Sequence, residues 1–547
     1  MKNLKVTTLA DLCLLTSEKY GKHTAFAMLE DGVITRRVSY EQMGSRSRQI
    51  SSLLKQLGIV KGDRVILFAD NSPEWGMSYF GIALANAVSV PLLTGFSTEQ
   101  IQNIVKHSDA SAICLTNITA ERLTNIEEGW EYSKIPLIYI DTIKVDKDME
   151  ITVSVNGNKQ QMTVPLENSD INAYNPEDLA TLIYTSGTSG NSKGVMLSSR
   201  NLISSALSSL DFVNVTTKDR VLSVLPLAHS YECSLGFLAT VYGGSTITYI
   251  DRPPSPSVLL PAVKLVRPTI MLSVPLLIEK IYNNGVAPKL AANKLYKFPL
   301  TRPLAIRVAG RKMIKALGGK IRFFGIGGAP LSKAVEDFLH RAGFPYAIGY
   351  GLTEAAPLVA GNAPLHFSPK TGLGAPTGVT MRIEKCPASN EPGVGEIQVK
   401  GPNVMMGYYK DSEQTAEAIT PDGWLRTGDL GRMEKKGRLF IRGRLKALIL
   451  GPSGENIYPE EIEGLLNTST LVEDALVYSS EKGELVAMVR LSEAAKAAAG
   501  AIEHVVEDLR TWVNTKLAVF SRLNRIEIRH EPFEKTPTMK IKRYLYV

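Results

Sequence analysis

Short apolar runs alternate with amphipathic stretches along the first part of the chain. The apolar runs predict buried strands at residues 24–28, 33–38, 64–68, 88–92 and 110–115. Helical spacing of apolar residues predicts helices at 8–20, 40–57, 73–87 and 98–107. Because strands that alternate with helices at this spacing need crossover connections, the pattern predicts a mostly parallel sheet covered on both faces, which is the α/β class.

The pattern continues downstream with a change near the end. Residues 131–178 form a polar connection with a hairpin signal at Asn156-Gly157. Further strands are expected at 179–184, 220–225, 320–326, 345–348, 395–400 and 438–442, with helices at 198–210, from Ser332 to about Gly343, and from Pro459 onward. The pattern of elements changes after Lys446. We therefore expect a large N-terminal domain of stacked, mostly parallel sheets with flanking helices over 1–445 and a smaller α+β domain over 446–547.

The loop that follows the apolar run 179–184 carries the clearest chemistry. It holds Gly187, Gly190 and Gly194, four hydroxyl side chains and the single cation Lys193. The glycines let backbone N–H groups turn toward an anion, and the lysine adds a mobile positive charge. We expect the loop to lie between a strand and the helix at 198–210 and to bind a polyphosphate. The four hydroxyl residues are Thr185, Ser186, Thr188 and Ser189.

This loop has two other interpretations. It is not a Walker A loop, because Ser192 precedes Lys193 and Gly194 follows it. A flexible Gly/Ser surface loop is the alternative that its composition alone favours. The preceding buried strand and the embedded lysine favour anion binding instead.

Further polar groups follow other predicted strands. His229 comes after the strand at 220–225, Gly327 and Gly328 follow the strand at 320–326, and the segment from Tyr350 to Glu354 follows the strand at 345–348. Ligands of open α/β sheets gather beyond the carboxyl ends of strands. The segment from Tyr350 to Glu354 offers an aromatic face for a base, a hydroxyl for a phosphate and a carboxylate for Mg²⁺. Asp429, in a turn-rich stretch, could accept hydrogen bonds from both hydroxyls of a ribose.

Composition limits the environment of the chain. Its four cysteines, at 13, 114, 233 and 386, lack metal-ligand or disulfide spacing, which suits a reducing compartment such as the cytoplasm. Asp11 interrupts the first apolar stretch, so we expect no signal peptide, and no apolar run is long enough to span a bilayer.

The net charge of +8 is unevenly distributed. Residues 285–322 contain ten Lys or Arg and no acidic residue, with aromatic and aliphatic side chains between them. A solvated basic face, a site for an anionic membrane surface and a nucleic-acid contact are three interpretations of this segment. No nucleic-acid-binding motif accompanies it, so we expect no nucleic-acid partner.

Taken together, these residues resemble the adenylate-forming superfamily of acyl-CoA synthetases, adenylation domains and luciferases. Within it, the chain is most similar to the long-chain fatty-acid–CoA ligases. The resemblance covers nearly the whole chain, and its motifs fall in family order at 185–194, 225–232, 327–331, 350–354, 427–429, 443–446, 453–463 and 535–540.

The resemblance implies two steps. A fatty carboxylate attacks the α-phosphorus of Mg·ATP to give acyl-AMP and pyrophosphate, and the thiol of coenzyme A then displaces AMP. It implies catalytic roles for Lys540, Glu354 and Thr185, with the last two also holding Mg²⁺. The residues that it assigns to ATP are Thr185, Ser186, Gly187, Thr188, Ser189, Gly190, Lys193, Gly327, Gly328, Ala329, Tyr350, Gly351, Thr353, Asp429 and Arg444.

The resemblance also implies a mobile C-terminal domain that swings about Lys446. The swing withdraws Lys540 and presents another face for the coenzyme A step. That face comprises Ser453, Gly454, Glu455 and Asn456. His229 and Tyr231 are assigned to an acyl pocket for medium- to long-chain fatty acids. The chain departs from the common pattern at Ala447, where an acidic residue is frequent, and at Met539, where glycine is frequent.

Two alternatives stay open. An acyl–carrier-protein ligase would share the first step but transfer the acyl group to a phosphopantetheine arm. A noncatalytic acyl- or nucleotide-binding protein could keep the fold, although the presence of Glu354, Asp429 and Lys540 argues against it. A contact of residues 285–322 with a membrane would place the cytoplasmic protein at a membrane surface.

Overall fold

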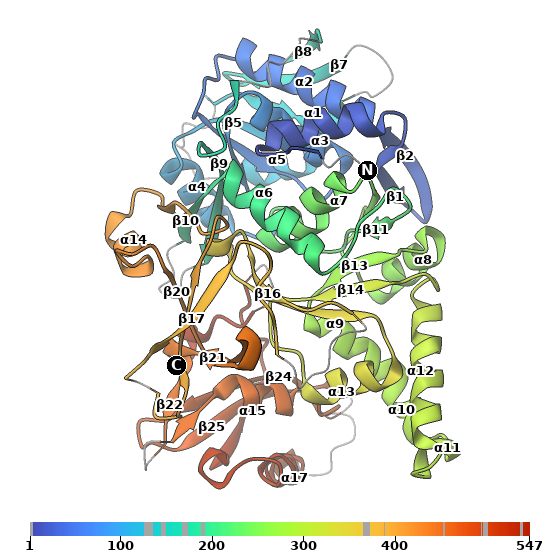
Figure 1. Cartoon of the computed structure of the whole chain (residues 1–547), viewed down its shortest axis with the longest axis vertical. Helices are drawn as coiled ribbons and strands as arrows, with labels where there is room; N and C mark the ends of the chain where they lie inside the picture. The colour runs from blue at the N-terminus through green and yellow to red at the C-terminus, as the bar shows by residue number, and fades with distance from the viewer. Residues whose placement is uncertain are drawn as a thin grey trace.

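Two large β-sheets with helices between and outside them form most of the molecule, and the last hundred residues form a smaller unit at one end (Figure 1). We describe a computed structural model of the chain. The structure describes residues 4–124, 135–143, 149–166, 173–186, 192–364, 372–387, 389–451, 455–493, 495, 502–536 and 540–547.

The first sheet has the strand order β16-β15-β14-β13-β11-β12-β1-β2. Its six central strands pair in parallel, and β16 and β2 pair antiparallel at the two edges. The strands are β1 (Thr24–Glu30), β2 (Val33–Ser39), β11 (Arg220–Leu222), β12 (Thr246–Ile250), β13 (Ile270–Ser273), β14 (Phe323–Ile326), β15 (Tyr346–Gly351) and β16 (Leu358–Gly361).

The second sheet has the order β19-β10-β9-β4-β3-β5-β6-β7-β8. Strands from β9 to β6 in this order pair in parallel, and the two ends are antiparallel. The strands are β3 (Arg64–Phe68), β4 (Val88–Pro91), β5 (Ala110–Leu115), β6 (Leu137–Tyr139), β7 (Met149–Val155), β8 (Asn158–Val164), β9 (Leu179–Ser186), β10 (Ser192–Ser198) and β19 (Gly407–Tyr408).

Most helices of this part lie between the two sheets, and two cover the other face of the second sheet through Ile101, Ile104 and Leu123. Several start at residues that cap them. Thr8, Ser39, Ser97 and Ser198 each form a capping box with the residue three positions later. The helices of this part are α1 (Leu9–Tyr20), α2 (Tyr40–Gln56), α3 (Pro73–Leu84), α4 (Thr98–His107), α5 (Asn117–Thr124), α6 (Ser199–Ser208) and α7 (Ala239–Tyr242), with a π-helix at Glu232–Leu238.

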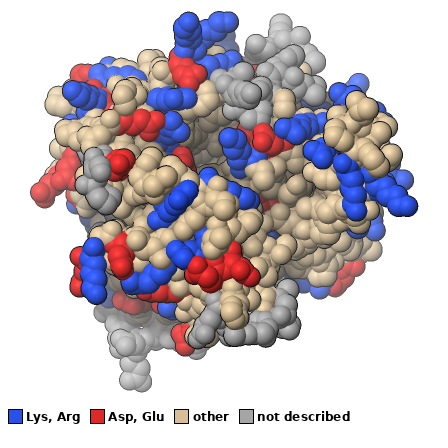
Figure 2. Space-filling view, turned by 90° about the horizontal axis from the view of Figure 1, so that it is seen from below, with Lys and Arg blue, Asp and Glu red and all other residues tan. Residues whose placement is uncertain are grey.

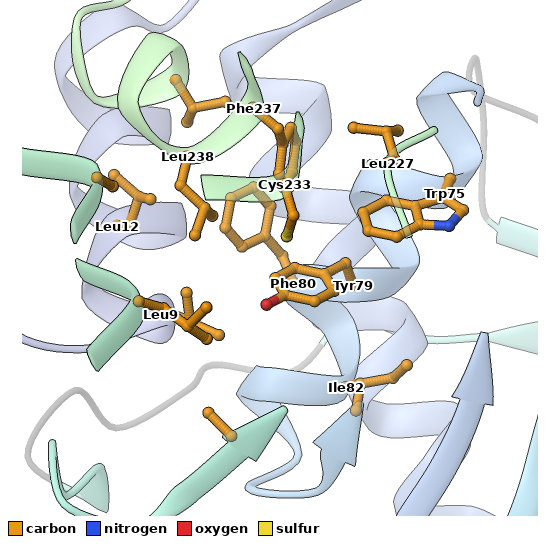
Figure 3. Close-up of a cluster of buried hydrophobic side chains, with 14 of the residues drawn as sticks. Leu9, Leu12, Trp75, Tyr79, Phe80, Ile82, Leu227, Cys233, Phe237 and Leu238 are labelled. Carbon is orange, nitrogen blue, oxygen red and sulfur yellow. The ribbon is translucent and has the colours of Figure 1, made fainter. Parts of the chain in front are cut away.

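One hydrophobic cluster joins the two sheets through these helices. Phe237 of the π-helix packs against Tyr79 and Phe80 of α3, with ring centroids 6.0 and 5.1 Å away, and against Trp75 at 6.0 Å (Figure 3). All four side chains are fully buried. Aromatic side chains bury more apolar area than other residues, so this contact contributes strongly to holding the π-helix on α3.

The outer face of the first sheet carries a second set of helices. Leu259, Ile306, Met313 and Phe338 from these helices pack with Phe324 of β14 in a separate cluster. The helices run along one side of the molecule in Figure 1. They are α8 (Pro256–Val266), α9 (Pro275–Lys280), α10 (Ala287–Ala291), α11 (Lys294–Lys297), α12 (Arg302–Ala316) and α13 (Lys333–Ala342).

A four-stranded antiparallel sheet leads to the smaller unit. It contains β17 (Thr380–Lys385), β18 (Val394–Lys400), β20 (Leu425–Glu434) and β21 (Arg438–Arg444), and α14 (Ser412–Ala418) lies beside it. Lys446 then lies in a short 3₁₀ turn, Leu445–Ala447. The residues beyond have their own hydrophobic cluster. They form β22 (Ile449–Leu450), β23 (Asn456–Ile457), α15 (Pro459–Leu466), β24 (Val472–Ser479), β25 (Leu485–Leu491), α17 (Ile502–Asn514) and β26 (Arg525–Ile528).

The structure confirms most expected elements and corrects several. The predicted loop at 185–194 does not lead from a strand into a helix, because its last residues belong to β10, which pairs antiparallel with β9 and precedes α6. Asp429 lies within the ten-residue strand β20 and not in a turn. Strand β11 ends at Leu222, and β6 adds a strand to the region expected to be a polar connection. Ser332 precedes α13, but its hydroxyl makes no capping hydrogen bond.

We expect Phe237→Ala to lower the free energy of unfolding by about 3–5 kcal/mol, because the substitution leaves a cavity among three buried aromatic rings. Urea denaturation followed by tryptophan fluorescence would measure the change. Val33→Ala is the matched control, since Val33 is exposed on β2. Equal losses in the two variants would contradict the packing described here.

Candidate functional site

The β9–β10 hairpin presents the lysine of the predicted phosphate loop. Thr185 on β9 lies opposite Lys193 on β10 in the antiparallel register. The hairpin thus places Thr185 and Lys193 on neighbouring strands, one on each side of the connection between β9 and β10. Gly187, Thr188, Ser189 and Gly190 lie outside the described residues, as does the side chain of Ser186.

A tyrosine connects Lys193 with Glu354. The ammonium of Lys193 lies 5.0 Å from the centre of the Tyr408 ring, which is within the range of a cation–π contact. The hydroxyl of Tyr408 donates a hydrogen bond to Glu354 Oε1 at 2.9 Å. Strand β19, which carries Tyr408, pairs with β10. The hairpin and the Glu354 carboxylate are therefore parts of one site.

Asp429 is the centre of a second group. Its Oδ2 accepts a hydrogen bond from Tyr350 at 2.7 Å, and its Oδ1 lies 3.0 Å from Nε of Arg444, the residue opposite on β21. Burial, with the charge of Asp429, raises the pKa of Tyr350 well above its usual value, so the phenol remains a donor. Each carboxylate oxygen still has a second acceptor direction, which leaves Asp429 able to bind further hydroxyl groups.

The glycines near this group allow a close approach of backbone segments. A Cβ atom at Gly351 would lie 2.0 Å from the carbonyl oxygen of Pro357, so no other residue fits there. Gly328 has a φ of +86°, in the left-handed region that favours glycine. Gly328 and Ala329 are exposed, so a planar ligand group could lie directly on their backbone.

His229 lies beside this site, and Tyr231, two residues later, lines an apolar cavity. Its Nδ1 accepts a hydrogen bond from the backbone N–H of Tyr231 at 3.2 Å, and the hydroxyl of the intervening Ser230 lies 3.3 Å from that of Thr353. Burial, followed by the positive charge of Lys540, lowers the pKa of His229 to about 4. The imidazole is therefore neutral near pH 7, with its proton on Nε2.

The cavity is narrow in this structure, with an interior volume of about 50 Å³, and it is partly open to solvent. Tyr231 and the backbone of β14, β15 and β16 contribute to its wall, whereas His229 does not line it. Its walls are mainly apolar, which suits a hydrocarbon chain. The apolar side chains include Phe212, Val215, Leu235, Ile270, Leu272 and Phe323.

A carboxyl group is buried directly behind this cavity. The Ser223 hydroxyl donates a 2.6 Å hydrogen bond to Glu232 Oε1, while Oε2 has no partner among the described residues. A Cβ atom at Gly236 would lie 2.5 Å from the Glu232 carboxyl carbon. Burial raises the pKa of Glu232 to about 8 against the smaller opposing effect of Ser223. The group is therefore mostly protonated near pH 7.

Lys540 stands at the turn of a small hairpin. The backbone N–H of Thr536 donates to the Lys540 carbonyl at 2.7 Å, and Lys535 pairs with Ile541. Arg543 anchors this hairpin, because its guanidinium donates to Glu463 of α15 at 2.6 Å and to the Val477 carbonyl at 2.7 Å. The position of Lys540 is thus fixed relative to the smaller unit.

The ammonium of Lys540 lies among groups from other elements. Desolvation, followed by the charge of Arg444, lowers the pKa of Lys540, and the charges of Asp429, Glu460 and Glu354 act in the opposite direction. Lys540 is nevertheless exposed to water. A side chain surrounded by protein yet accessible to solvent is expected at the wall of an open ligand site. The site therefore combines Lys540, Arg444, Asp429 and Glu354.

The residues assigned to the coenzyme A step lie elsewhere. Asn456 donates to the Ser389 hydroxyl at 2.8 Å, and its Oδ1 accepts from the backbone of Asn390 at 3.3 Å. Glu455 precedes it in the same turn, while Ser453 and Gly454 lie outside the described residues. This arrangement places Lys540 in the site while Asn456 is held at the 389–391 loop.

Three residues of the site were missed in the sequence. Tyr408 lies on a strand of two residues, which is too short for a periodic signal, and only the preceding Gly407, with φ of +140°, marks the turn. Glu460 lies in the first turn of α15, where an acidic residue commonly stabilises the helix without any further role. Arg543 gave no local signal, because its partner Glu463 is distant in sequence.

Comparison with known proteins gives three kinds of likeness. The profile of the family described as AMP-binding enzyme matches residues 16–409. The peroxisomal long chain acyl-CoA synthetase 6 of Arabidopsis thaliana is 31% identical over 92% of this chain and 79% of its own. Long-chain-fatty-acid–CoA ligase 1 of Homo sapiens is 30% identical over 92% of this chain and 80% of its own.

Solved structures share the fold. The O-succinylbenzoate coenzyme A synthetase of Bacillus subtilis, in complex with AMP, superposes with a TM-score of 0.74 at 22% identity, covering 98% of this chain and 97% of that one. MatB from Rhodopseudomonas palustris with bound ATP gives a TM-score of 0.74 at 22% identity, with 98% of each chain covered. These similarities confirm the predicted α/β architecture.

We expect Glu232→Gln to change the pH dependence of stability. Between about pH 4.5 and 8 the folded protein keeps a proton on Glu232 that the unfolded chain releases, so wild-type stability falls as pH rises. Glu232→Gln has no such proton to release. Its free energy of unfolding should therefore rise relative to that of wild type by up to about 1.4 kcal/mol per pH unit within that window. Urea denaturation at pH 5.5, 6.5 and 7.5 measures the difference.

Glu413→Gln, at an exposed carboxylate of α14, is the control for this comparison. Its stability should follow the wild-type curve at every pH. Parallel curves for Glu232→Gln and wild type would show that the Glu232 carboxyl does not retain its proton on folding.

Proposed function

Because the chain belongs to the AMP-binding enzyme family, we propose that it is an ATP-dependent fatty acyl-CoA ligase that forms AMP. In the first step a carboxylate oxygen bonds to the α-phosphorus of ATP, and pyrophosphate leaves. In the second step the sulfur of coenzyme A bonds to the acyl carbon, its proton is released, and AMP leaves. The single observation that carries the proposal is that Glu354, Asp429, Arg444 and Lys540 share one site beside an apolar cavity.

The first step brings two anions together, so the site must offset their repulsion. Lys193 on β10 and Lys540 in the C-terminal hairpin supply the cations. We propose that Lys540 bridges the carboxylate and the α-phosphate. Its contribution comes from positioning as well as charge, since phosphoryl transfer needs an in-line approach. We propose that residues 185–193 hold the outer phosphates and that Thr353 contacts the α-phosphate.

We propose that the nucleoside lies against Tyr350 and the backbone of Gly327, Gly328 and Ala329. Asp429 already holds Tyr350 and Arg444 by one oxygen each, and it keeps acceptor capacity for ribose hydroxyls. The hydrogen bond to Asp429 fixes the Tyr350 ring, so the ring offers a preorganised face to adenine.

Glu354 and Thr185 fit a role in Mg²⁺ binding. Mg²⁺ in nucleotide enzymes is commonly held by one or two carboxylates together with substrate phosphates and water, and this site offers one carboxylate and a hydroxyl near the phosphate hairpin. When bound, the ion neutralises phosphate charge. Among the described residues no group of three His, Cys, Asp or Glu side chains could form a complete protein cage for a metal, and this agrees with an ion that enters with ATP.

The apolar cavity is the proposed acyl site. Tyr231 lines it, and the nearby His229 feels the charge of Lys540. We therefore propose that the substrate carboxylate lies at the mouth of the cavity, toward this ammonium. A medium- to long-chain fatty acid is the substrate class that this cavity and the long-chain relatives support. The hydration of an apolar chain is unfavourable, and this favours its transfer from water into such a cavity.

We propose that the second step needs a rotation about Lys446. Lys540 now occupies the site, whereas Asn456 is hydrogen-bonded to the 389–391 loop. A hinge motion would withdraw Lys540 and bring residues 453–456 to the acyl-adenylate. The domain boundary at Lys446 is part of this proposal.

A carrier protein is the alternative acceptor, and competition between coenzyme A and an acyl carrier protein would separate the two. The cytoplasm is the compartment that we propose, since all four cysteines carry free thiols. Residues 285–322 are the part of the chain that we propose to contact a membrane.

The proposed activity predicts fatty-acid-dependent exchange of labelled pyrophosphate into ATP. We expect exchange to rise with chain length through the medium-chain acids, because each added methylene increases the apolar area buried in the cavity. Acids of graded length with ATP and Mg²⁺ provide the series, and acetate is the control. Binding of ATP without exchange for any acid would instead support a noncatalytic binding protein.

We expect Lys540→Ala to lower the rate of acyl-AMP formation at least about 100-fold, because it removes the cation that we place at the reacting groups. Thioester formation from supplied acyl-AMP should be nearly unchanged, since Lys540 serves only the first step. Single-turnover assays of the two half-reactions measure this split. Lys542→Ala is the control, as Lys542 pairs with Glu534 in the same hairpin. Equal loss in both half-reactions would refute the assignment.

A further inference from the structure

Helices α10, α11 and α12 form a strongly basic projection at one corner of the molecule. Residues 285–322, which include these helices, carry ten Lys or Arg and no acidic residue. The segment reaches the lower right extremity in Figure 1, and the view from below shows basic side chains and uncharged surface together on that side (Figure 2). The projection therefore presents a positive face to solvent.

The cations of this projection are not neutralised by the protein. Arg322 forms a 2.7 Å ion pair with Asp219. The other nine, from Lys289 to Lys320, are exposed and have no ion pair with any described carboxylate. An ordinary solvated surface mixes charges of both signs, because like charges close together repel. This face instead retains an unbalanced positive potential.

Large apolar side chains lie at the tip of the same projection. Leu300 is 97% exposed and Phe298 is 65% exposed, both in the connection between α11 and α12. Leu295 and Leu304 flank them and are also exposed. Helix α12 packs on the first sheet through Ala305, Ile306 and Met313, so its outer face cannot bury these residues.

Hydrogen bonds hold the tip in one conformation. Thr301 Oγ1 donates to the Leu295 carbonyl at 2.6 Å, and Arg302 Nε donates to the Tyr296 carbonyl at 3.0 Å. Asn293 caps α11 by accepting from the Leu295 N–H at 2.9 Å. Phe298 and Leu300 therefore project from an ordered turn whose polar groups are satisfied.

From this arrangement we infer that the tip inserts into the interface of an anionic lipid membrane. Phe298 and Leu300 enter the boundary between head groups and acyl chains, while Lys294, Lys297 and Arg307 contact lipid phosphates. Apolar insertion combined with attraction to anionic lipid is the usual basis of peripheral membrane binding. Within the described part of the chain no helix is long and apolar enough to cross a bilayer, so the contact is at the surface.

A nucleic acid or an acidic protein would also be attracted to the cations. A nucleic-acid backbone, however, offers no apolar environment for an aliphatic side chain such as Leu300. A lipid surface matches both features at once, since it provides phosphates and hydrocarbon within a few ångströms. The inference deepens the proposed function, because fatty acids dissolve in membranes, but its test measures binding and does not need turnover.

Sedimentation with phosphatidylcholine vesicles, with and without phosphatidylglycerol, tests the inference on the full chain. We expect binding to the anionic vesicles to be at least about tenfold tighter and to weaken as salt is added. Phe298→Ser with Leu300→Ser should lower that binding about tenfold or more, because these residues supply the apolar insertion. Lys294→Glu with Lys297→Glu should reduce it by at least as much.

Matched controls come from other exposed positions. Ile118→Ser with Val519→Ser removes comparably exposed apolar side chains, and Lys435→Glu with Lys436→Glu reverses two exposed cations elsewhere. Both controls should bind like wild type. Unchanged binding of the tip variants, or wild-type binding no stronger to anionic than to neutral vesicles, would overturn the inference.

Two further measurements separate the inference from its alternatives. Duplex DNA that binds as tightly as the vesicles, and equally to the Phe298/Leu300 variant, would indicate a nucleic-acid site and overturn the lipid assignment. Pyrophosphate exchange with dissolved fatty acid should be equal in wild type and tip variants. If the wild type binds vesicles but shows no exchange, the proposed reaction fails while the membrane site stands.

Discussion

The carboxylates of Asp429, Glu460 and Glu354 offset the repulsion between the Lys540 ammonium and the Arg444 guanidinium. Desolvation and the guanidinium both disfavour the charged lysine, and Asp429, Glu460 and Glu354 favour it. These groups come from β20, β21, α15 and the turn after β15, so the site exists only when the two parts of the chain meet. A bound carboxylate and phosphate would add negative charge beside Lys540 and Arg444. Such binding would favour the charged form of Lys540.

The same constraint explains how the surrounding elements are built. Parallel strands β13, β14 and β15 bring their carboxyl ends to one edge, where Tyr350 lies near the end of β15 and the segments after β14 and β15 supply Gly327 and Glu354. The antiparallel β9–β10 hairpin brings Lys193 from the other large sheet, and Tyr408 joins it to Glu354. Behind this polar edge the cavity and the protonated Glu232 keep the interior free of net charge. Polar chemistry and apolar binding therefore lie on adjacent sides of one sheet.

Sequence patterns were reliable where a local signal and burial agreed. The bounds of β3, β5 and α4 were predicted as observed, because apolar runs and a capping serine mark their ends. Strand β10 was missed because Ser192, Lys193 and Gly194 have the composition of a loop, although pairing with β9 makes them a strand. Gly428 and Gly431 likewise made β20 look like a turn. The roles of Lys540 and Arg444 could be assigned only through the family resemblance, since their proximity depends on contacts between distant segments that no local pattern encodes.

The 389–391 loop forms hydrogen bonds with the smaller unit. Glu391 accepts from Arg442 at 2.7 Å and from Tyr458 at 3.2 Å, and the neighbouring Ser389 accepts from Asn456. Arg442 precedes the proposed pivot and remains with the larger part, whereas Tyr458 and Asn456 follow it and would move away. Opening would therefore break the hydrogen bonds of Asn456 and Tyr458 and keep that of Arg442. In the proposed rotation these hydrogen bonds would add to the barrier for leaving the arrangement with Lys540 in the site. Glu391, far from the proposed reacting atoms, would therefore influence the rate of that motion.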